Sequence, residues 1–450
     1  MKAHRSVLGI LSVTLVAALA FLLVPALVDS GGRASAEQPF TLIYYDGHMH
    51  TTRSDGSGSV AQIKATAQVR GLGAVIITDH CTSLTQAEWA SLVAETAAAS
   101  DGSFLALPAF EITGSEGIFN RGHMNAYNVA DPFVGDDALE RCPEEVWPDP
   151  LNPAGTGANP ESLAKWADFV HSQGGIANHN HTSGSTDLGY GVNNIEIYNQ
   201  SHVDDVAYYA SLLGYPPQQA WQFGITLNNF AIYGERDVNM LVPFPGFPTP
   251  IPLRLALYIA TQFFPPNIGQ WLGSPQAPLN SWDDLLMAYV EGDVDTPTFG
   301  VANSDAHNTG SPGSDVGVAK NGLYAKALTS TEVYKAIKAG RSFATTGPSL
   351  NFDINGEFMG DTAEIASGGS ANLNLTVNAA TPGYILYKIR IVKNGEVLQT
   401  ISPLSPTHQL NLADTVTEDG YYRIEVESVP ASGSGLPQFA YSNPVFVDVP

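Results

Sequence analysis

Hydrophobic and polar positions alternate along the chain in two different ways. Between Thr41 and about Gly300, short apolar runs typical of strands alternate with stretches that have the spacing of helices. The strand-like runs are Thr41–Tyr45, Ala74–Thr78, Phe104–Ile112, Ile195–Tyr198 and Thr298–Ala302, and the helix-like stretches are Ser59–Arg70, 86–99 and one from Asn159-Pro160 to Gly174-Gly175. Strands that alternate with helices predict βα units in a mostly parallel sheet or barrel.

The pattern changes at Ser349. Asn372–Val377, Lys388–Val392 and Tyr421–Val426 alternate apolar and polar residues at period two, and Asn394-Gly395 carries the signal of a tight hairpin. No helical pattern remains in this part of the sequence. We therefore predict an α/β domain over residues 40–348 and a small all-β, sandwich-like domain over residues 349–450.

The N-terminus has the features of an export signal. Lys2 and Arg5 precede an apolar run from Val7 to Val28, and Ala34-Ser-Ala36 follows. A positive start, an apolar core and a small-residue cleavage site predict a signal peptide over residues 1–36. The run is also long enough to stay as a membrane anchor, which leaves that alternative open. Either way the protein is expected to be exported, as a secreted, periplasmic or cell-surface protein.

An insertion of about residues 200–295 interrupts the α/β pattern. Its middle, residues 241–282, holds nine prolines and a single charged residue, Arg254. Leu253–Phe264 is an apolar helix candidate that is too short to span a bilayer. The stretch is interpreted as a buried packing insertion, with a lid or apolar substrate wall and a membrane-touching surface as alternatives.

Composition narrows the function classes. The chain of 450 residues has 44 acidic and 20 basic side chains, a formal net charge of −24. Such a surface repels phosphate backbones, which argues against nucleic acid as a main partner. The sequence has two cysteines, Cys81 and Cys142. In an exported protein they can form a disulfide or remain two separate buried thiols, and both interpretations stay open.

Histidines and carboxylates gather at the ends of the predicted strands. They are His48, His50, Asp55, His80, Glu111, His123, His179, His181, Asp305 and His307. The C-terminal ends of strands form the active face of a parallel barrel, and alternate residues of a strand point the same way, so His48 and His50 can share one ion. Imidazole and carboxylate together suit Zn, Mn or Fe(II). The number of ligands exceeds the needs of one ion and predicts two or three ions, bridged by Glu111 or Asp305.

In order along the chain, these motifs resemble those of the PHP (polymerase and histidinol phosphatase) superfamily of metal-dependent phosphoesterases. The resemblance covers roughly residues 44–348. The motifs are Asp46-Gly-His48-Met-His50-Thr, Ser54-Asp55-Gly56, Thr78-Asp79-His80, Pro108-Ala-Phe-Glu111, Gly122-His123, Gly174-Gly-Ile-Ala-Asn-His-Asn180-His181, Ile195-Glu196-Ile-Tyr-Asn199 and Ser304-Asp305-Ala-His307. The resemblance implies a distorted (β/α)₇ barrel with a trinuclear-type metal site.

The resemblance also implies a ligand layout. The first ion would take His48, His50, Glu111 and Asp305, the second Glu111, His123 and His181, and the third Asp55, His80 and His307. The family usually has Asn-His-Pro where this chain has Asn180-His181-Thr182, so His181 is preferred over His179. Asp55 stands where other members have histidine, which leaves the number and identity of the ions open.

The segment Gly340–Pro348, followed by a β domain, is similar to exported PHP proteins of the carbaryl-hydrolase-like subgroup. The resemblance to the superfamily as a whole implies hydrolysis of a small-molecule phosphoester by a metal-bridging hydroxide. A carboxylester or carbamate hydrolase that uses the same ions is the first alternative. An inactive surface binding protein is a second alternative, from another class.

Three further roles follow from the chemistry. Asp305 is the candidate that protonates the leaving group, with a metal-bound water as the alternative. Arg53 and Arg121 are candidates for binding a substrate phosphate, with an ordinary surface cation as the alternative for each. Glu196 and Asn199, at a strand end, are expected to support the ligands rather than bind metal.

Overall fold

The computed structural model describes residues 40–112, 123–130, 160–180, 191–212, 216–228, 241–242, 249, 251–252, 282–310, 314–432 and 435–450. Phe40–Pro450 forms one compact unit. The predicted signal peptide, Arg121, Cys142, His181 and most of residues 241–282 lie outside the described residues. Within the described part, none of the helices is both long and apolar enough to cross a membrane.

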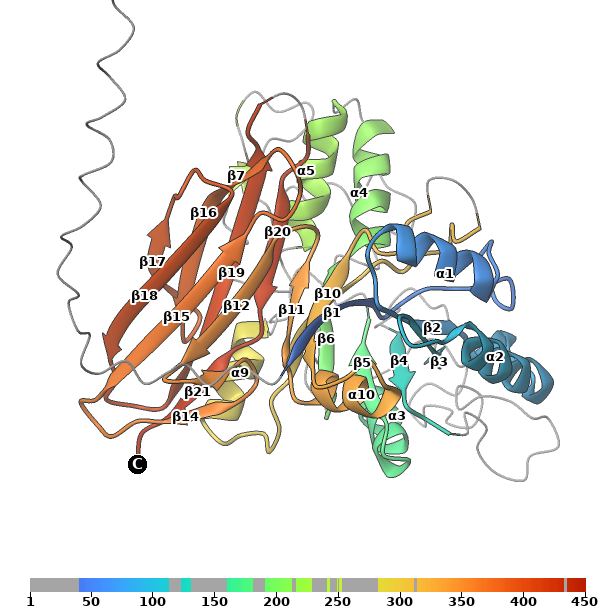
Figure 1. The fold of residues 1–450 in the computed structure, drawn as a ribbon, viewed down its shortest axis with the longest axis horizontal. Coiled ribbons are helices and arrows are strands. Elements are labelled where there is room, and N and C mark those ends of the chain that lie inside the picture. The colour runs from blue at the N-terminus through green and yellow to red at the C-terminus, as the bar shows by residue number, and fades with distance from the viewer. Residues whose placement is uncertain are drawn as a thin grey trace, which may run out of the picture. The chain divides into compact units, whose positions relative to one another are not determined.

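Strands and helices alternate in the first part of the chain (Figure 1). In order they are β1 (Thr41–Asp46), α1 (Val60–Val69), β2 (Ala74–His80), α2 (Gln86–Ala99), β3 (Leu105–Ile112), β4 (Met124–Tyr127), α3 (Pro160–Ser172), β5 (Ile176–His179), β6 (Asn194–Asn199), α4 (Gln200–Leu212), α5 (Pro217–Asn228), β7 (Leu241–Val242), β8 (Ile251–Pro252), α9 (Trp282–Val290), β9 (Phe299–Asn303), β10 (Lys320–Ala325), α10 (Ser330–Lys338) and β11 (Ser342–Thr345). The predicted strands and helices that fall on described residues are confirmed, most with ends shifted by one or two residues.

From Ser349 onward the described chain contains strands alone. They are β12 (Ser349–Ile354), β13 (Glu357–Phe358), β14 (Thr362–Glu364), β15 (Ser370–Asn378), β16 (Tyr384–Lys393), β17 (Glu396–Ile401), β18 (Thr407–Thr415), β19 (Gly420–Pro430), β20 (Gln438–Ser442) and β21 (Val445–Asp448). Asn394 and Gly395 have φ angles of 50° and 77°. Two positive φ angles are what a tight hairpin turn requires, and the predicted hairpin between β16 and β17 is confirmed.

Side-chain caps fix where α1 and α2 begin. Ser59 precedes α1 and forms a capping box with Gln62, and Thr85 precedes α2 and forms one with Glu88. Each box pairs backbone N–H groups that the first turn of a helix leaves open. These two starts are therefore encoded locally.

The sheet differs from the expected closed, mostly parallel barrel. The strand order is β14-β21-β19-β20-β11-β10-β1-β2-β3-β4-β5-β6-β9, with β16 and β17 joined beside β19, and the path does not close. The pairs β1–β2, β2–β3, β5–β6 and β6–β9 are parallel, whereas β4 is antiparallel to both β3 and β5. The described fold is thus mixed α/β with one large sheet.

Between β9 and β10, hydrogen bonds from a side chain replace the backbone ladder. Asn321 on β10 accepts a hydrogen bond from Ala302 N on β9 at 2.8 Å and donates one to Ala302 O at 2.6 Å. We call this contact the β9–β10 seam. Its amide groups occupy the positions of a missing backbone pair, so β9 and β10 are held together although no strand ladder joins them.

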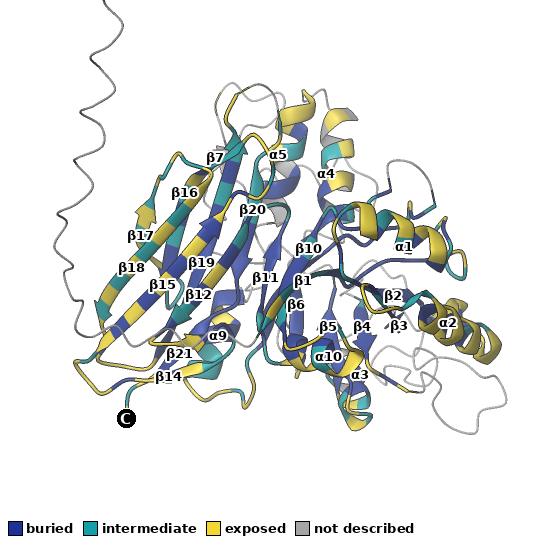
Figure 2. Ribbon diagram, viewed as in Figure 1, coloured by how far each residue is buried: buried dark blue, intermediate teal, exposed yellow. Residues whose placement is uncertain are grey.

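Apolar side chains of the C-terminal part are buried between two sheets. A second sheet, β13-β12-β15-β18, contributes Leu375 and Val377 to a cluster that also contains Ile389 and Ile424 from the large sheet. β15 alternates strictly between exposed and buried residues, whereas the central strands of the large sheet are buried along most of their length (Figure 2). This alternation is expected for a strand such as β15 that has one face in the apolar core and the other in solvent.

Candidate metal centre

The polar residues predicted at strand ends lie at one edge of the large sheet. His48 and His50 follow β1, His80 ends β2, Glu111 lies next to the last residue of β3, and Asp305 and His307 follow β9. His123 precedes its strand, β4, but β4 runs against β3, so its start lies at the same edge where β3 ends. The reversed strand therefore brings His123 to the same place as the other ligands.

Hydrogen bonds between loops hold the two main ligand segments together. The N–H of His50 donates to Ala306 O at 3.0 Å, which ties the segment after β1 to the segment after β9. The turn after His50 is closed on Asp79, which accepts from Thr51 N at 2.6 Å and from the Ser54 hydroxyl at 2.8 Å. At Gly56 a Cβ atom would lie 2.1 Å from His50 O, so this turn requires glycine.

Five ligand atoms from four residues, at three strand ends, face one another. Nε2 of His48 and Nε2 of His50 are 3.3 Å apart. Asp305 Oδ1 lies 3.2 Å from the first and 3.3 Å from the second. Glu111 places Oε1 at 3.3 Å from His48 Nε2 and Oε2 at 3.4 Å from His50 Nε2.

These separations match the edges of a metal coordination shell. Two ligand atoms at about 2.0–2.2 Å from a tetrahedral zinc ion lie about 3.3–3.6 Å apart. His48, His50 and Glu111 are all fully buried. Nitrogen and oxygen donors crowded at this spacing away from water fit a divalent cation better than they fit one another.

A second group surrounds Asp55. Its Oδ2 lies 3.2 Å from His307 Nε2 and 3.3 Å from His80 Nε2, and its Oδ1 lies 3.5 Å from His50 Nδ1. The ring of His50 stacks on that of His307 with centroids 4.3 Å apart. The side chains of Asp55 and His307 are 52% and 39% exposed, so this group forms the open side of the cluster.

A third group lies on the other side of Glu111. Nδ1 of His123 is 2.9 Å from Glu111 Oε1, and Nδ1 of His80 is 3.1 Å from Glu111 Oε2. The carboxylate of Glu111 therefore faces both this group and the His48–His50 group, as expected for a bridging ligand. His80 lies between the second and third groups, which departs from the layout implied by the resemblance.

His181, the histidine preferred from the sequence, lies outside the described residues. His179, its alternative, ends β5 and is buried. Asn180 donates from Nδ2 to Glu111 Oε1 at 2.9 Å. The segment after β5 thus reaches the cluster through an amide that fixes the bridging carboxylate.

Burial and neighbouring carboxylates act on the histidines in opposite directions: the pKa is raised at His48, His80 and His307, whereas burial lowers the pKa of His50. Burial alone would lower the pKa of His48, but Asp305, Glu111 and Glu196 outweigh it and raise that pKa well above its ordinary value. Burial would raise the pKa of Glu111, yet His48 and His123 hold it well below its usual range. His307 behaves like His48: Asp55 and Asp305 overcome burial and raise its pKa to about 9. The cluster therefore attracts positive charge, whether protons or metal ions.

Residues behind the ligands orient them. Glu196 Oε1 lies 2.8 Å from His48 Nδ1, and Glu196 is itself held by Asn199 and Asn303, which donate to it at 2.8 and 2.9 Å. A carboxylate on the far nitrogen fixes the tautomer and ring orientation of a ligating histidine. The expectation that Glu196 and Asn199 lie behind the ligands agrees with this geometry.

Asp305 has a backbone conformation that is uncommon outside glycine. Its φ angle is 51°, in the left-handed region. Strained residues of this kind persist where the surroundings fix them and cluster at functional sites. The conformation turns the chain after β9, and the carboxylate of Asp305 meets the two buried histidines.

Arg53, a candidate for binding substrate, has partners on α2. It donates to the Ser91 hydroxyl at 3.1 Å and pairs with Glu95. This placement gives it a structural role, and a substrate role for Arg53 stays a prediction. Arg121 lies outside the described residues. Cys81 is a buried half-cystine, and Cys142 also lies outside the described residues.

Next to the site lies a buried acid, Asp46, which the sequence analysis included in a motif without giving it a role. Asp46 ends β1 and accepts from the Ser304 hydroxyl at 2.5 Å and from Gly317 N at 2.8 Å. Burial raises the pKa of Asp46 to about 6, although these donors counteract the shift. The sequence signal that could have singled out Asp46 is a carboxylate at the end of an otherwise apolar strand.

Neither a protein-family model nor a curated protein matches the chain. Solved structures resemble it distantly. A two-domain protein from Bacteroides vulgatus, described as containing a predicted PHP-like metal-dependent phosphoesterase, is 12% identical over 90% of this chain and 96% of its own, with a TM-score of 0.36. An amidohydrolase from Chromobacterium violaceum is 18% identical over 37% of this chain and 81% of its own, with a TM-score of 0.25. A protein from Bifidobacterium adolescentis described as a metal-dependent phosphoesterase is 17% identical over 46% of this chain and 90% of its own, also with a TM-score of 0.25.

Two of these solved structures are thus described as metal-dependent phosphoesterases, one of them PHP-like. All three TM-scores are below 0.5, so the likenesses carry no argument about this chain. The functional conclusion rests on the site itself.

Proposed function

We propose that the protein is a metal-dependent hydrolase of the PHP type that cleaves a small-molecule phosphoester with two or three divalent ions, Zn, Mn or Fe. The observation that carries the proposal is the set of imidazole nitrogens and carboxylate oxygens spaced 3.2–3.4 Å apart around His48, His50, Glu111 and Asp305. Structural metal sites seldom hold so many ligands, whereas multi-ion hydrolytic sites need them.

Three groups of residues would hold the ions. The first is His48, His50, Glu111 and Asp305, the second is Asp55, His80, His307 and His50, and the third is His80, Glu111 and His123. The resemblance adds His181 to the third group. Divalent ions bound there would supply Lewis-acid activation of a water and neutralise charge on the ester oxygens. Asp55 and His307 are the most exposed members, so substrate would reach the cluster from their side.

The chain's own residues supply proton handling. Asp305 presents Oδ1 to the two buried histidines, and its Oδ2 lies 3.5 Å from Asn199 Nδ2. We assign the proton for the leaving group to this second oxygen, because it is not shared with His48 and His50. Export and cleavage of a predicted signal peptide belong to the same proposal.

The first experiment measures metal and activity in one preparation. The purified full chain would be analysed for bound metal and assayed with p-nitrophenyl phosphate, bis-p-nitrophenyl phosphate and p-nitrophenyl acetate, with and without added Mn²⁺ or Zn²⁺. We expect two or three ions per chain and turnover of a phosphate ester. Metal with acetate cleavage alone would instead support the carboxylester or carbamate hydrolase. Absence of both metal and turnover would instead support the inactive surface binding protein.

A double variant tests the ligand assignment directly. His48→Ala with His50→Ala should lower the bound metal by at least one ion per chain, because both Nε2 atoms face the same pair of carboxylates. His171→Ala is the matched control, since His171 lies in the last turn of α3 and bonds to Asn193 away from the cluster. Equal metal content in the double variant and the control, by elemental analysis, would contradict the assignment.

A further inference from the structure

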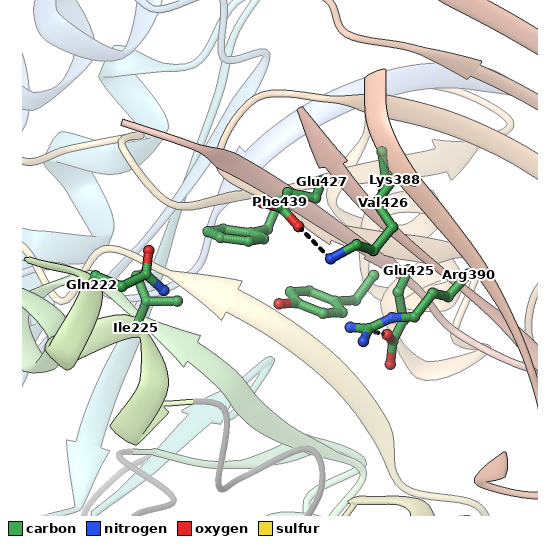
Figure 3. A pocket seen from close by; sticks show the side chains of 9 residues that line it. Gln222, Ile225, Lys388, Arg390, Glu425, Val426, Glu427 and Phe439 are labelled. Atoms are coloured by element: carbon green, nitrogen blue, oxygen red, sulfur yellow. Dashed lines mark hydrogen bonds and ion pairs between the residues drawn. The ribbon is translucent and has the colours of Figure 1, made fainter. Parts of the chain in front are cut away.

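A cavity of about 180 Å³ lies between α5 and three C-terminal strands, β16, β19 and β20. None of the candidate metal ligands that the structure describes lines it. Gln222 and Ile225 on α5 face Phe439, Lys388 and Arg390 across it (Figure 3). Its chemistry therefore differs from that of the metal centre.

The strand register builds one wall of this cavity as two matching rows. Arg390 pairs with Glu425, and Glu425 with Tyr441 on the next strand. Two residues along, Lys388 pairs with Glu427, and Glu427 with Phe439. Each row therefore runs from a cation through a carboxylate to an aromatic ring.

Charge balances within each row. Arg390 Nη2 lies 2.6 Å from Glu425 Oε2, and Lys388 Nζ lies 3.3 Å from Glu427 Oε2. Two cations and two carboxylates leave the wall without net charge. Such a wall offers many hydrogen-bond donors and acceptors but gives no advantage to a charged ligand.

The two rows end in aromatic rings, Tyr441 and Phe439, which both line the cavity. The ring of Phe439 stacks with that of Tyr441, with centroids 6.5 Å apart and planes at 14°. The same ring also stacks with Trp221 of α5, with centroids 6.3 Å apart and planes at 18°. Three nearly parallel rings thus extend from the sheet to the helix.

One carboxylate of the wall is fixed from behind. Glu425 is 3% exposed, and its Oε1 accepts from Arg423 Nη1 at 2.5 Å. Arg423 in turn forms a two-pronged contact with Asp283 on α9, at 2.8 Å for each bond. A polar group held in this way keeps its position before any ligand arrives, which lowers the ordering cost of binding.

We propose that this cavity binds a neutral saccharide, one pyranose ring at a time. A sugar ring presents a flat C–H face that packs on aromatic rings and hydroxyl groups that exchange hydrogen bonds with carboxylate, guanidinium and amide. The wall supplies both kinds of contact, and its balanced charge favours a ligand without charge. The volume is below the roughly 300 Å³ at which drug-sized ligands begin, so it suits a single ring.

Calorimetric titration of the full chain tests the proposal. The probes are the methyl glycosides of glucose, galactose and mannose, and N-acetylglucosamine. We expect saturable binding of at least one of them, weakened about tenfold in Phe439→Leu and in Arg390→Gln, because each variant removes one contact of the ring. Phe439→Leu keeps an apolar side chain and so preserves the packing.

Matched controls separate this site from others. Leu398→Ala removes an exposed apolar side chain of β17, and Lys393→Gln removes a paired cation of β16; neither residue lines the cavity. Both should bind sugar like the wild type. Binding should also persist after chelation of metal, which separates this site from the proposed phosphoesterase centre.

Four outcomes would overturn the proposal. They are no binding of any of these sugars, binding unchanged in both cavity variants, binding that is lost on chelation, and tighter binding of glucose 6-phosphate than of glucose. The last would show that the site selects charge. Unfolding curves of each variant would identify a loss caused by misfolding, and the two chemically different substitutions make a shared folding failure recognisable.

Discussion

At the scale of single residues, the candidate site depends on carboxylates that lie behind histidines. His48 makes this plainest, because its two ring nitrogens have different neighbours: Nδ1 faces Glu196 and Nε2 faces the ligand cluster. The first contact determines which nitrogen carries the proton, and it leaves the second available to a metal ion.

Glu196→Gln tests this arrangement. The amide keeps the shape of the side chain but loses its charge, so His48 becomes a weaker and less well oriented ligand. We expect metal affinity to fall about 10–100-fold, the usual effect of changing such a partner. The measurement is competition with a chelator of known affinity. An affinity equal to that of the wild type would contradict the role given to Glu196.

A second prediction at this scale concerns pH. In the metal-free protein the pKa of His307 is raised from 6.5 to about 9 by Asp55 and Asp305, against the effect of burial. A raised pKa in the folded state stabilises the fold fully below pH 6.5, and this stabilisation is lost as pH rises through about 9. The melting temperature of metal-stripped protein should therefore fall over that interval.

The control for this prediction is the metal-loaded protein. A bound ion keeps the imidazole neutral throughout, so its melting temperature should change less over the same pH range. His307→Gln in metal-stripped form should also show a smaller decline. A decline of the same size in all three samples would assign the effect to other groups.

At the scale of elements, the β9–β10 seam is a replacement for backbone pairing. Asn321→Ala should destabilise the protein by about 2–5 kcal/mol, because the N–H and C=O of Ala302 would both lose their buried partner. Denaturant unfolding measures this. Asn374→Ala, which removes an exposed amide of β15 bonded to Asp353, is the control and should have a small effect.

The elements also show what the sequence could predict. Periodicity predicted α1 and α2 closely, and the capping boxes at their starts are local signals that agree with it. The direction of β4 could not be predicted, since a short apolar strand carries no mark of the direction in which its neighbours run. The same limit hid the open path of the sheet and the role of Asn321, which depends on register with β9.

Ligand residues were easier to predict than their grouping. Histidines and carboxylates at the ends of apolar runs stand out. The structure brings together His48, His50, Asp55, His80, Glu111, His123, Asp305 and His307. Their sharing does not follow from spacing: His80 faces both Asp55 and Glu111, and His50 faces two groups. Only the packing of the strands decides this.

At the scale of the whole compact unit, a buried ion cluster joins the α/β part of the chain, before Ser349, to the all-β part that follows. Arg423 on β19 contacts Asp283 on α9 with both side chains fully buried, and it lies over the ring of Trp282. Tyr421 donates to the same carboxylate at 2.6 Å. The contact is therefore dry and depends on both partners.

Arg423→Met tests this contact. It removes the cation and leaves Asp283 buried, so we expect a loss of about 3–5 kcal/mol in the free energy of unfolding. Lys393→Gln breaks a more exposed pair with Asp414 and should cost less than about 1 kcal/mol. Similar losses in the two variants would show that Arg423 does not hold the two parts together.

The pairing of β11 with β20 makes the late strands an extension of the sheet that carries the ligands. Their junction is a backbone ladder rather than a linker. Gene fusion and domain exchange most easily transfer segments whose removal breaks no backbone hydrogen bonds between strands. The two parts of this chain are consequently expected to have been inherited and to have diverged together, and a swap of the late strands between relatives would have to carry β11 and its neighbours with it.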